Sequence, residues 1–587
     1  MTKTPAAGRL AAATLLCVSL LLGGWLRISG LSARSITHPE MYVPNIPLPE
    51  GISEPAERVT LARILTGTFS SDTHPPGYYL LMFPWTRVVG TSLAAIRLPS
   101  ALFGIASIVL VFWFGLMAGW RIAGVLAAVL LSFSGFHVFW SQVARMFALE
   151  CFLGLGASIL LLRIARSTER SGVLTAVYVG LILAGLASHV FFWTLFGAHL
   201  IWIFAGALGR GLLPDIARAQ LLALVLGSPL LAFAAYQSGN TVAELSDNFP
   251  LYASQYLSFA FALPTANSGF FTTPVPFTGS TVFLAIRAVL FLIGICFFVR
   301  GLLQLWQSSS DKRMALRTST GKQFWILIWG AAAVIGTIEI AGFLFMVQKL
   351  PPEFINSSVR ITRIFSILPF TILAIALVVD SRWGRLPAPG NWRRLVRGEN
   401  GLIVLLATLP LLALAAFSQF RPILNQRGLL FTTPYLLLLL AIGVVTLQSR
   451  VWRAATGLVL ALTCVGSLKS YQGMMVDPAD YARFANVVKS EIRTGDLVFI
   501  RKAWYETPIL YYLHKDRYHL VGRDYRAACA KNPDARVWVV MLYDADPAKD
   551  MQAALAGYRT SSTLNGDHAK AILYEPAGAS ISQTFKN

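Results

Sequence analysis

Two short stretches of this sequence combine acidic, histidine and proline residues in a way that could serve catalysis. His38-Pro39-Glu40 directly follows an apolar run, and Asp72-Thr73-His74-Pro75-Pro76-Gly77-Tyr78-Tyr79 lies further along the same polar segment. A carboxylate within hydrogen-bond reach of a hydroxyl group can take its proton as that hydroxyl attacks an electrophilic carbon. The competing interpretation is that the prolines only end helices and the polar residues form a solvated loop.

The elements that must position these residues are membrane-spanning helices. Hydrophobic residues make up 55% of the 587-residue chain and charged residues 13%, whereas charged residues alone are about a quarter of a soluble protein. Runs of about 18 or more apolar residues can cross a bilayer, and lipid permits only helices there. We therefore predict an α-helical polytopic membrane protein with about 13 spans. They are 10–29, 98–118, 123–140, 149–162, 173–190, 191–208, 219–236, 281–299, 324–347, 364–379, 401–418, 429–447 and 454–468.

The basic residues between the spans predict the topology, because segments rich in Lys and Arg face the cytoplasm. They begin with Lys3 and Arg9 and include Arg121, Arg163, Arg166, Arg170, Arg210, Arg218, Arg300, Lys312, Arg313, Arg317, Lys322, Arg382, Arg385, Arg393, Arg394, Arg397, Arg450 and Arg453. The N-terminus is therefore predicted to be cytoplasmic. The periplasmic side of a bacterial inner membrane receives the loops 30–97, 141–148, 237–280, 348–363 and 419–428 and the C-terminal tail. The net charge of +21 reflects this arrangement, and we predict no nucleic-acid partner.

Two apolar segments need a separate interpretation. Residues 78–90 contain Pro84 and Arg87, so we predict a short helix at the membrane interface; counting it as a span would invert every later loop. The first apolar run is longer than a typical signal-peptide core of about 7–15 residues, which favours an uncleaved signal anchor over a cleaved signal peptide.

The tail differs in character from the rest of the chain. Short apolar strands such as 496–500 and 536–541 alternate with helical stretches such as 506–513. We predict a transmembrane domain over residues 1–468 and a small, soluble, periplasmic α/β domain over residues 469–587.

Three motifs in order resemble those of one enzyme family. They are Asp72-x-His74-Pro75-Pro76-x-Tyr78-Tyr79, then Arg97-Leu98-Pro99-Ser100-Ala101-Leu102-Phe103-Gly104, then Ser141-Gln142-Val143-Ala144-Arg145-Met146-Phe147-Ala148-Leu149. This order resembles glycosyltransferase family 39 of the GT-C membrane glycosyltransferases, which includes the protein O-mannosyltransferases and is similar to the aminoarabinose transferase of lipid A. The resemblance is strongest from about residue 36 to 207, and Arg427 with the following apolar stretch is similar to a late family motif.

The resemblance implies transfer of a sugar from a polyprenyl-phosphate donor to a lipid, glycan or protein acceptor at the outer membrane face, by an inverting displacement. The family carries an acid soon after its first span, and Glu40 stands at that place. We therefore expect Glu40 to act as the general base and Asp72 to orient the acceptor or to hold His74. For Glu40 the alternative is a carboxylate that caps an interfacial helix.

The leaving group in such a reaction is a lipid phosphate, whose developing charge is best met by positioned cationic donors. His74, Arg145 and Arg427 are the expected donors, and Arg360 and Arg363 are weaker candidates. Two further residues of the motifs complete the expected substrate-binding and phosphate-binding set: Tyr78 and Gln142. The alternative for the arginines is that they reach from helix ends to the membrane interface.

The sequence departs from the family pattern at Val143, where an acid is common. Glu150 is a weak substitute for that acid, and His189 fits packing better than acceptor contact. We predict no metal site and no cofactor: Asp544-Ala545-Asp546 reads as a solvated turn, and the five cysteines show no metal-binding spacing. Dependence on a divalent metal stays open.

Two other functions compete with sugar transfer. A transporter or lipid flippase would carry ionisable residues inside its spans and internal repeats; the sequence shows no repeat, and we expect ionisable residues at span ends. A polysaccharide polymerase or ligase would place its chemistry in a large late loop, but the 237–280 loop has only Glu244 and Asp247 as acids.

Overall fold

The computed structural model describes the N-terminal half of the chain, several later helices and most of the tail. The described residues are 6–46, 60–66, 74–167, 171–207, 213–241, 297, 300–302, 304–305, 398–417, 427–447, 449–474, 481–500, 507–513, 518–522, 524–542, 547, 549–566 and 569–577. They belong to two compact units. The helical unit comprises residues 1–29, 73–78 and 99–474, and the loop-and-sheet unit comprises residues 30–72, 79–98 and 475–587.

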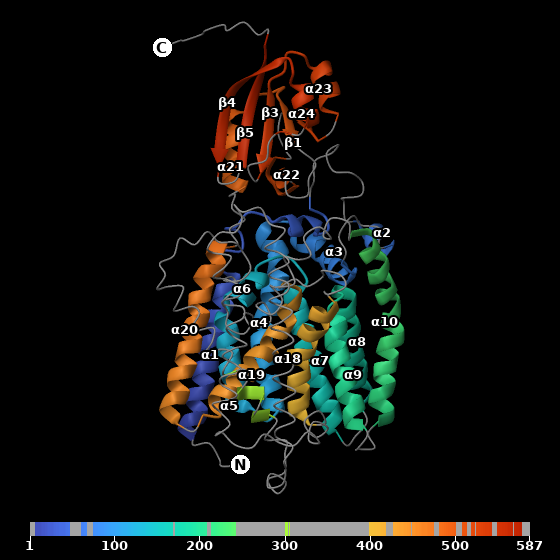
Figure 1. Cartoon of the computed structure of the whole chain (residues 1–587), viewed down its shortest axis with the longest axis vertical. Coiled ribbons are helices and arrows are strands. Elements are labelled where there is room, and N and C mark those ends of the chain that lie inside the picture. The colour runs from blue at the N-terminus through green and yellow to red at the C-terminus, as the bar shows by residue number, and fades with distance from the viewer. Residues whose placement is uncertain are drawn as a thin grey trace, which may run out of the picture. The chain divides into compact units, whose positions relative to one another are not determined.

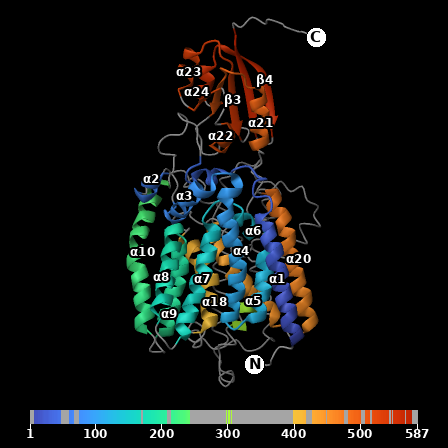
Figure 2. The ribbon, with the colours of Figure 1, turned by 180° about the vertical axis from the view of Figure 1, so that it is seen from behind.

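Long apolar helices build the helical unit, and Figures 1 and 2 show them lying side by side. Their bounds are α1 (Ala6–Ile28), α4 (Leu93–Met117), α5 (Arg121–Phe133), α6 (Gly135–Ser141), α7 (Phe147–Arg166), α8 (Gly172–Ser188), α9 (Phe192–Ala207), α10 (Leu213–Thr241), α18 (Glu399–Phe417), the 3₁₀ helix η7 (Arg427–Thr432), α19 (Thr433–Val445) and α20 (Arg450–Met474). Four described stretches are long and apolar enough to cross a membrane: Leu10–Ile28, Leu93–Met117, Phe147–Arg166 and Arg427–Val445. The pair of α5 and α6 makes a fifth if it counts as one span. These are the helices of a membrane protein.

The described helices lie where the apolar runs predicted spans, from α1 through α10 and again from α18 through α20. The predicted spans 324–347 and 364–379, and nearly all of 281–299, lie outside the described residues. The total of about 13 spans therefore stays a prediction. The helix predicted over residues 78–90 is confirmed as α3 (Gly77–Val89), which continues through Pro84.

The predicted span 123–140 differs from the expectation, because it bends by 62° between α5 and α6. Ser134 caps the N-terminus of α6, where its hydroxyl accepts a hydrogen bond from the amide of His137. The bend leaves carbonyl groups at the end of α5 without partners from a continuing helix. Arg27 of α1 supplies the donors: its Nη2 lies 2.9 Å from Leu131 O and its Nη1 lies 3.1 Å from Ser132 O.

The sheet of the other unit has five strands in the order β2-β1-β3-β5-β4. Strand β1 pairs in parallel with β2 and β3, and β5 pairs antiparallel with β3 and β4. The bounds are α21 (Tyr481–Glu491), β1 (Leu497–Ile500), α22 (Thr507–Leu513), β2 (His519–Val521), α23 (Tyr525–Lys531), β3 (Val537–Leu542), α24 (Lys549–Ala554), β4 (Tyr558–Gly566) and β5 (Ala569–Pro576). The strands predicted at 496–500 and 536–541 and the helix predicted at 506–513 are β1, β3 and α22.

Side chains of β1 alternate between two cores, as the pleat of a strand requires. Val498 and Ile500 pack in a cluster with residues of α21 and α22. Leu497 and Phe499 pack in a cluster with residues of α23 and α24. The tail therefore forms a three-layer α/β/α arrangement, visible around the strands in Figure 1.

The same unit contains the start of the first long loop, with the 3₁₀ helix η1 (His38–Tyr42), the short helix α2 (Leu61–Thr66) and most of α3. Asn45 anchors this loop to α3: its side-chain amide donates to Phe83 O at 3.1 Å and to Thr86 Oγ1 at 2.8 Å. Asn45 has a φ of 65°, a left-handed conformation that asparagine tolerates better than most residues. The turn at Asn45 keeps η1 and α3 in one compact structure.

Candidate functional site

Glu40 lies in η1, a short turn that local sequence specifies. Pro39 occupies the first turn, where its missing N–H costs nothing, and Thr37 precedes the helix in an extended conformation. The amide of Thr37 donates to Glu40 Oε2 at 2.9 Å, and the Thr37 hydroxyl lies 3.1 Å from the same oxygen. The side chain of Glu40 is fully buried. The loop therefore folds its acid inward, away from bulk water.

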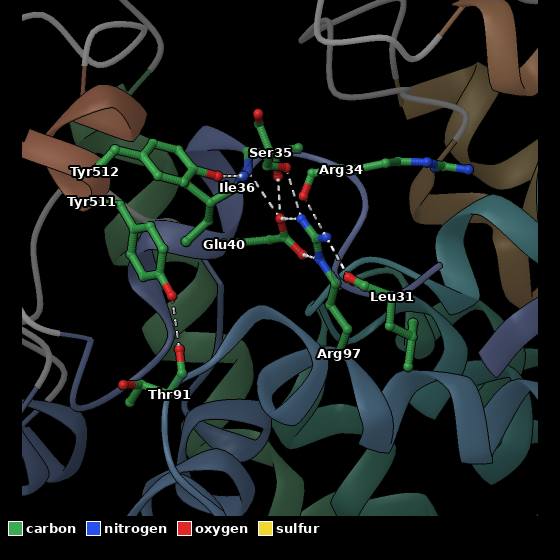
Figure 3. Close-up of polar contacts among 10 residues, drawn as sticks. Leu31, Arg34, Ser35, Ile36, Glu40, Thr91, Arg97, Tyr511 and Tyr512 are labelled. Atoms are coloured by element: carbon green, nitrogen blue, oxygen red, sulfur yellow. Dashed lines mark hydrogen bonds and ion pairs between the residues drawn. The ribbon is translucent and has the colours of Figure 1, made fainter. Parts of the chain in front are cut away.

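Arg97, in the first turns of α4, is the partner of Glu40 (Figure 3). Its Nε lies 2.7 Å from Glu40 Oε1 and its Nη2 lies 2.7 Å from Oε2, which is the two-pronged geometry of a strong arginine–carboxylate pair. The remaining donors reach backbone carbonyls. Nη1 donates to Leu31 O and Arg34 O at 2.8 and 3.0 Å, and Nη2 donates to Ser35 O at 2.8 Å. Arg97 thus uses all five of its N–H groups.

The Glu40–Arg97 pair is fixed in orientation and excluded from water. A buried carboxylate is stable as an anion when a cation and hydrogen-bond donors replace the water that it has lost. The same contacts bind residues 31–35 to the start of α4. The pair can therefore present an oriented carboxylate, and it also gives the first loop its shape.

Arg34 is a second cation near this pair. Burial lowers the pKa of its guanidinium, as does the charge of Arg97, whereas Glu40 acts in the opposite direction. Its side chain points away from the Glu40 carboxylate in Figure 3. Arg97 makes the two short charged hydrogen bonds to the Glu40 carboxylate.

A second cluster of ionisable side chains lies in the helical unit. Glu150, in the first turn of α7, is fully buried, and its Oε1 lies 3.1 Å from Nδ1 of His189. The ring of His189 stacks on that of His74 with 4.9 Å between centroids. Phe147 and Phe191 meet His189 edge-on at 5.8 and 4.7 Å. We call His74, Glu150 and His189 the histidine cluster.

Arg145 adds a positive charge beside this cluster. It lies in the turn between α6 and α7, is 4% exposed, and acts electrostatically on Glu150. Its carbonyl accepts a hydrogen bond from the Ser100 hydroxyl at 3.2 Å. Two predicted phosphate-binding residues are therefore linked to the surroundings of Glu150: Arg145 acts on it electrostatically, and His74 stacks on its partner His189.

The other predicted residues have varied surroundings. Tyr78 is fully buried at the start of α3. Gln142 uses its amide to cap α1, because Nε2 donates to Leu26 O at 2.7 Å and to Ser29 O at 3.0 Å. Arg427 is the first residue of η7 and is partly buried. The residues Asp72, Arg360 and Arg363 lie outside the described residues, as does the sequence Asp544-Ala545-Asp546.

The predicted candidates divide between the two units. Glu40 belongs to the loop-and-sheet unit, whereas His74, Tyr78, Gln142, Arg145 and Arg427 belong to the helical unit. Their assigned roles stay predictions. Within the described part of the chain, no group of three His, Cys, Asp or Glu residues is arranged to hold a metal ion.

Sequence reasoning missed several partners. In the sequence Arg97 is recognised only as part of a motif. A cation at the start of an apolar helix nevertheless indicates that a partner for its charge lies nearby. Glu150 and His189 are 39 positions apart in the sequence, and nothing local reveals that they meet. Val143, at the position where an acid was expected, is buried at 4% exposure.

No protein-family model and no curated protein sequence matches this chain. Among solved structures it is similar to ArnT from Cupriavidus metallidurans bound to undecaprenyl phosphate, at 14% identity and a TM-score of 0.40 over 97% of this chain and 98% of that one. It is also similar to the archaeal oligosaccharyltransferase AglB from Archaeoglobus fulgidus in complex with an inhibitory peptide and a dolichol-phosphate. The identity is 12% and the TM-score 0.42, over 98% of this chain and 76% of that one. A third similar structure is the arabinofuranosyltransferase AftD from Mycobacteria, at 11% identity and a TM-score of 0.42 over 97% of this chain and 42% of that one. These neighbours are GT-C glycosyltransferases, the group that the sequence motifs resemble.

Proposed function

We propose that this protein is a membrane glycosyltransferase of the inner membrane. It moves a sugar from a polyprenyl-phosphate donor to a hydroxyl group of a lipid, glycan or protein acceptor at the periplasmic face. The observation that carries the proposal is the state of Glu40, the acid that follows the first span. It is buried, and Arg97 and Thr37 orient it. These contacts keep the carboxylate ionised, which is the form that can accept a proton, and they fix its orientation.

In the proposed reaction Glu40 is the general base. The acceptor oxygen attacks the anomeric carbon, the bond from that carbon to the phosphate oxygen breaks, and the carboxylate takes the hydroxyl proton. Asp72 orients the acceptor. The lipid phosphate leaves with the bonding electrons and meets His74, Arg145 and Arg427, while Tyr78 and Gln142 complete the substrate contacts.

The histidine cluster supports the part of this proposal that concerns the phosphate. Arg145 acts electrostatically on Glu150, and a preorganised donor needs a partner to hold it in place. The ring of His74 is held by stacking on His189, which in turn contacts Glu150. Such support keeps a cationic or hydrogen-bonding side chain ready for an anion.

One observation favours transport as a second candidate function. We expected ionisable residues only at the ends of spans, but His199 lies within α9 and is fully buried. Its Nε2 lies 3.0 Å from Ser158 Oγ and its Nδ1 lies 3.0 Å from Tyr178 Oη. Tyr435 and Gln220 extend this chain of hydrogen bonds across five helices. A polar chain inside a helix bundle is a feature of transporters, and it also ties helices together in lipid.

The experiment that decides is transfer of radiolabelled sugar in membranes that carry the wild type, Glu40→Gln or Glu399→Gln. The donors are a panel of polyprenyl-phosphate sugars, and the acceptors are total cell-envelope material. Glu399 is a matched control because it forms an ion pair with Arg166 that is about 40% exposed. We expect Glu40→Gln to lose transfer and Glu399→Gln to keep it.

The outcomes separate the two candidate functions. Retained transfer in a correctly folded Glu40→Gln variant removes Glu40 as the base. Movement of labelled donor across the bilayer, with no transfer from any donor, replaces the glycosyltransferase proposal with lipid transport. Folding is checked by size-exclusion chromatography of the detergent-solubilised variants.

A further inference from the structure

Two adjacent tyrosines of α22 contact the first loop, one near Glu40 and the other just before the start of α4. Tyr511 and Tyr512 meet edge to face, with 5.1 Å between ring centroids and 83° between ring planes. Successive residues of a helix point in different directions, so the two hydroxyls reach different targets (Figure 3). Both targets belong to the same unit as the tail.

The Tyr512 hydroxyl accepts a hydrogen bond from the amide of Ile36 at 2.9 Å. The next amide along the chain, that of Thr37, donates to Glu40. Two successive backbone amides therefore make the two connections: that of Ile36 binds α22, and that of Thr37 binds the Glu40 carboxylate. A shift of Ile36 cannot occur without disturbing Thr37, because only one peptide unit separates the two amides.

Ser35 adds a second contact between the loop and the tail. Its hydroxyl accepts from the amide of Ala482 at 3.2 Å, in the first turn of α21, where helix amides lack partners in their own helix. Its carbonyl accepts from Arg97 at 2.8 Å. Ser35 thus joins α21 to the cation that holds Glu40.

The Tyr511 hydroxyl reaches the other half of the pair. It donates to Thr91 O at 3.2 Å, just before the start of α4, the helix that carries Arg97. Burial raises the pKa of both tyrosines, while the positive charge of Arg97 acts in the opposite direction. The tail therefore contacts the loop that carries Glu40 and the segment that leads to Arg97.

We propose that Tyr511 and Tyr512 are positioning residues, through which the C-terminal α/β domain keeps the Glu40–Arg97 pair aligned for the reaction. The proposal gives the tail a role that its sequence does not reveal. Its catalytic consequence rests on the proposed function, whereas its structural part does not.

Hydrogen exchange of the full-length protein in nanodiscs tests the structural part. Tyr512→Phe removes the acceptor of the Ile36 amide and keeps the ring, and we expect that amide to exchange about fivefold faster. Ser35→Ala should act in the same direction on the amide of Ala482. Tyr525→Phe is the matched control, because the Tyr525 hydroxyl donates to Ile500 O and Gly522 O within the tail. It should leave exchange of residues 35–40 unchanged.

The kinetics of sugar transfer test the catalytic part. We expect Tyr512→Phe and Tyr511→Phe each to lower kcat about fivefold and to leave the KM for the donor within about twofold, because the donor contacts lie elsewhere. If kcat fell only because the tail had lost a buried tyrosine hydroxyl, Tyr525→Phe would lower kcat as well. If a variant were misfolded, its thermal unfolding would show this. Unchanged exchange at Ile36 and unchanged kcat in Tyr512→Phe overturn the inference, even where Glu40→Gln abolishes transfer. If no donor supports transfer, faster exchange at Ile36 still establishes the contact between tail and loop.

Discussion

Replacing Arg97 tests how far the first loop depends on one side chain. Arg97→Met removes two charged hydrogen bonds to Glu40 and three to the carbonyls of residues 31, 34 and 35. Removing one partner of a buried ion pair costs about 3–5 kcal/mol, because the other charge stays buried without compensation. Local opening of the loop should then become at least about a hundredfold more frequent, since about 1.4 kcal/mol corresponds to a factor of ten.

Hydrogen exchange of the amides of Glu40 and Val43 measures this opening directly. Both close the turns of η1, with bonds of 2.9 Å to Thr37 O and 3.0 Å to Glu40 O. Arg97→Lys keeps the charge but has at most three donors in place of five, so we expect a smaller loss of about 2 kcal/mol. The exchange rates should therefore rank as wild type, then Arg97→Lys, then Arg97→Met.

A double variant separates the charge from the packing. Glu40→Leu with Arg97→Met buries no charge, so its loop should open less often than that of Arg97→Met alone. The carbonyls that Arg97 held remain without donors at about 1 kcal/mol each, so wild-type protection should not return. If Arg97→Met leaves exchange of residues 36–43 at the wild-type rate, or if the double variant is as unstable as the sum of the singles, the pair does not hold this loop.

Three further predictions concern other parts of the chain. Gly104→Ala should lower thermal stability in detergent by about 1–3 kcal/mol, because the new Cβ would overlap the side chain of Ser141, whereas Gly197→Ala should be tolerated because nothing lies within 4 Å of its Cβ. His189→Phe keeps the packing against Phe147 and Phe191 but leaves the buried Glu150 side chain without its contact to His189; we expect a loss of about 1–3 kcal/mol in thermal unfolding and a partial recovery on adding Glu150→Leu. Burial raises the pKa of the Cys529 thiol, with the Tyr558 hydroxyl acting in the opposite direction, so its thiolate fraction at pH 8 is below that of a free cysteine. Maleimide labelling of Cys529 should accordingly be slow in the folded protein and should rise on denaturation; fast labelling of the native protein would show that this core is open.

The sequence by itself determined that this protein lies in a lipid bilayer, and it determined much of the local structure. Apolar runs are a property of neighbouring residues, and lipid leaves a helix as the one solution for them, so α1, α4 and α7 lie where composition predicts. The strands of the tail were readable for the same reason, because alternation over a few residues is local. The position of Glu40 directly after the first span was also visible from the sequence alone.

Only the tertiary structure decided which side chains meet. Glu40 and Arg97 are separated by 57 positions, and Ile36 and Tyr512 by 476, so no periodicity in the sequence connects them. Arg27 fills the break between α5 and α6 because bending there exposes carbonyl groups, a need that appears only once both helices are in place. Packing decides which groups pair in the interior. A buried acceptor has lost its hydrogen bonds to water, and any donor that the fold brings within reach can replace them.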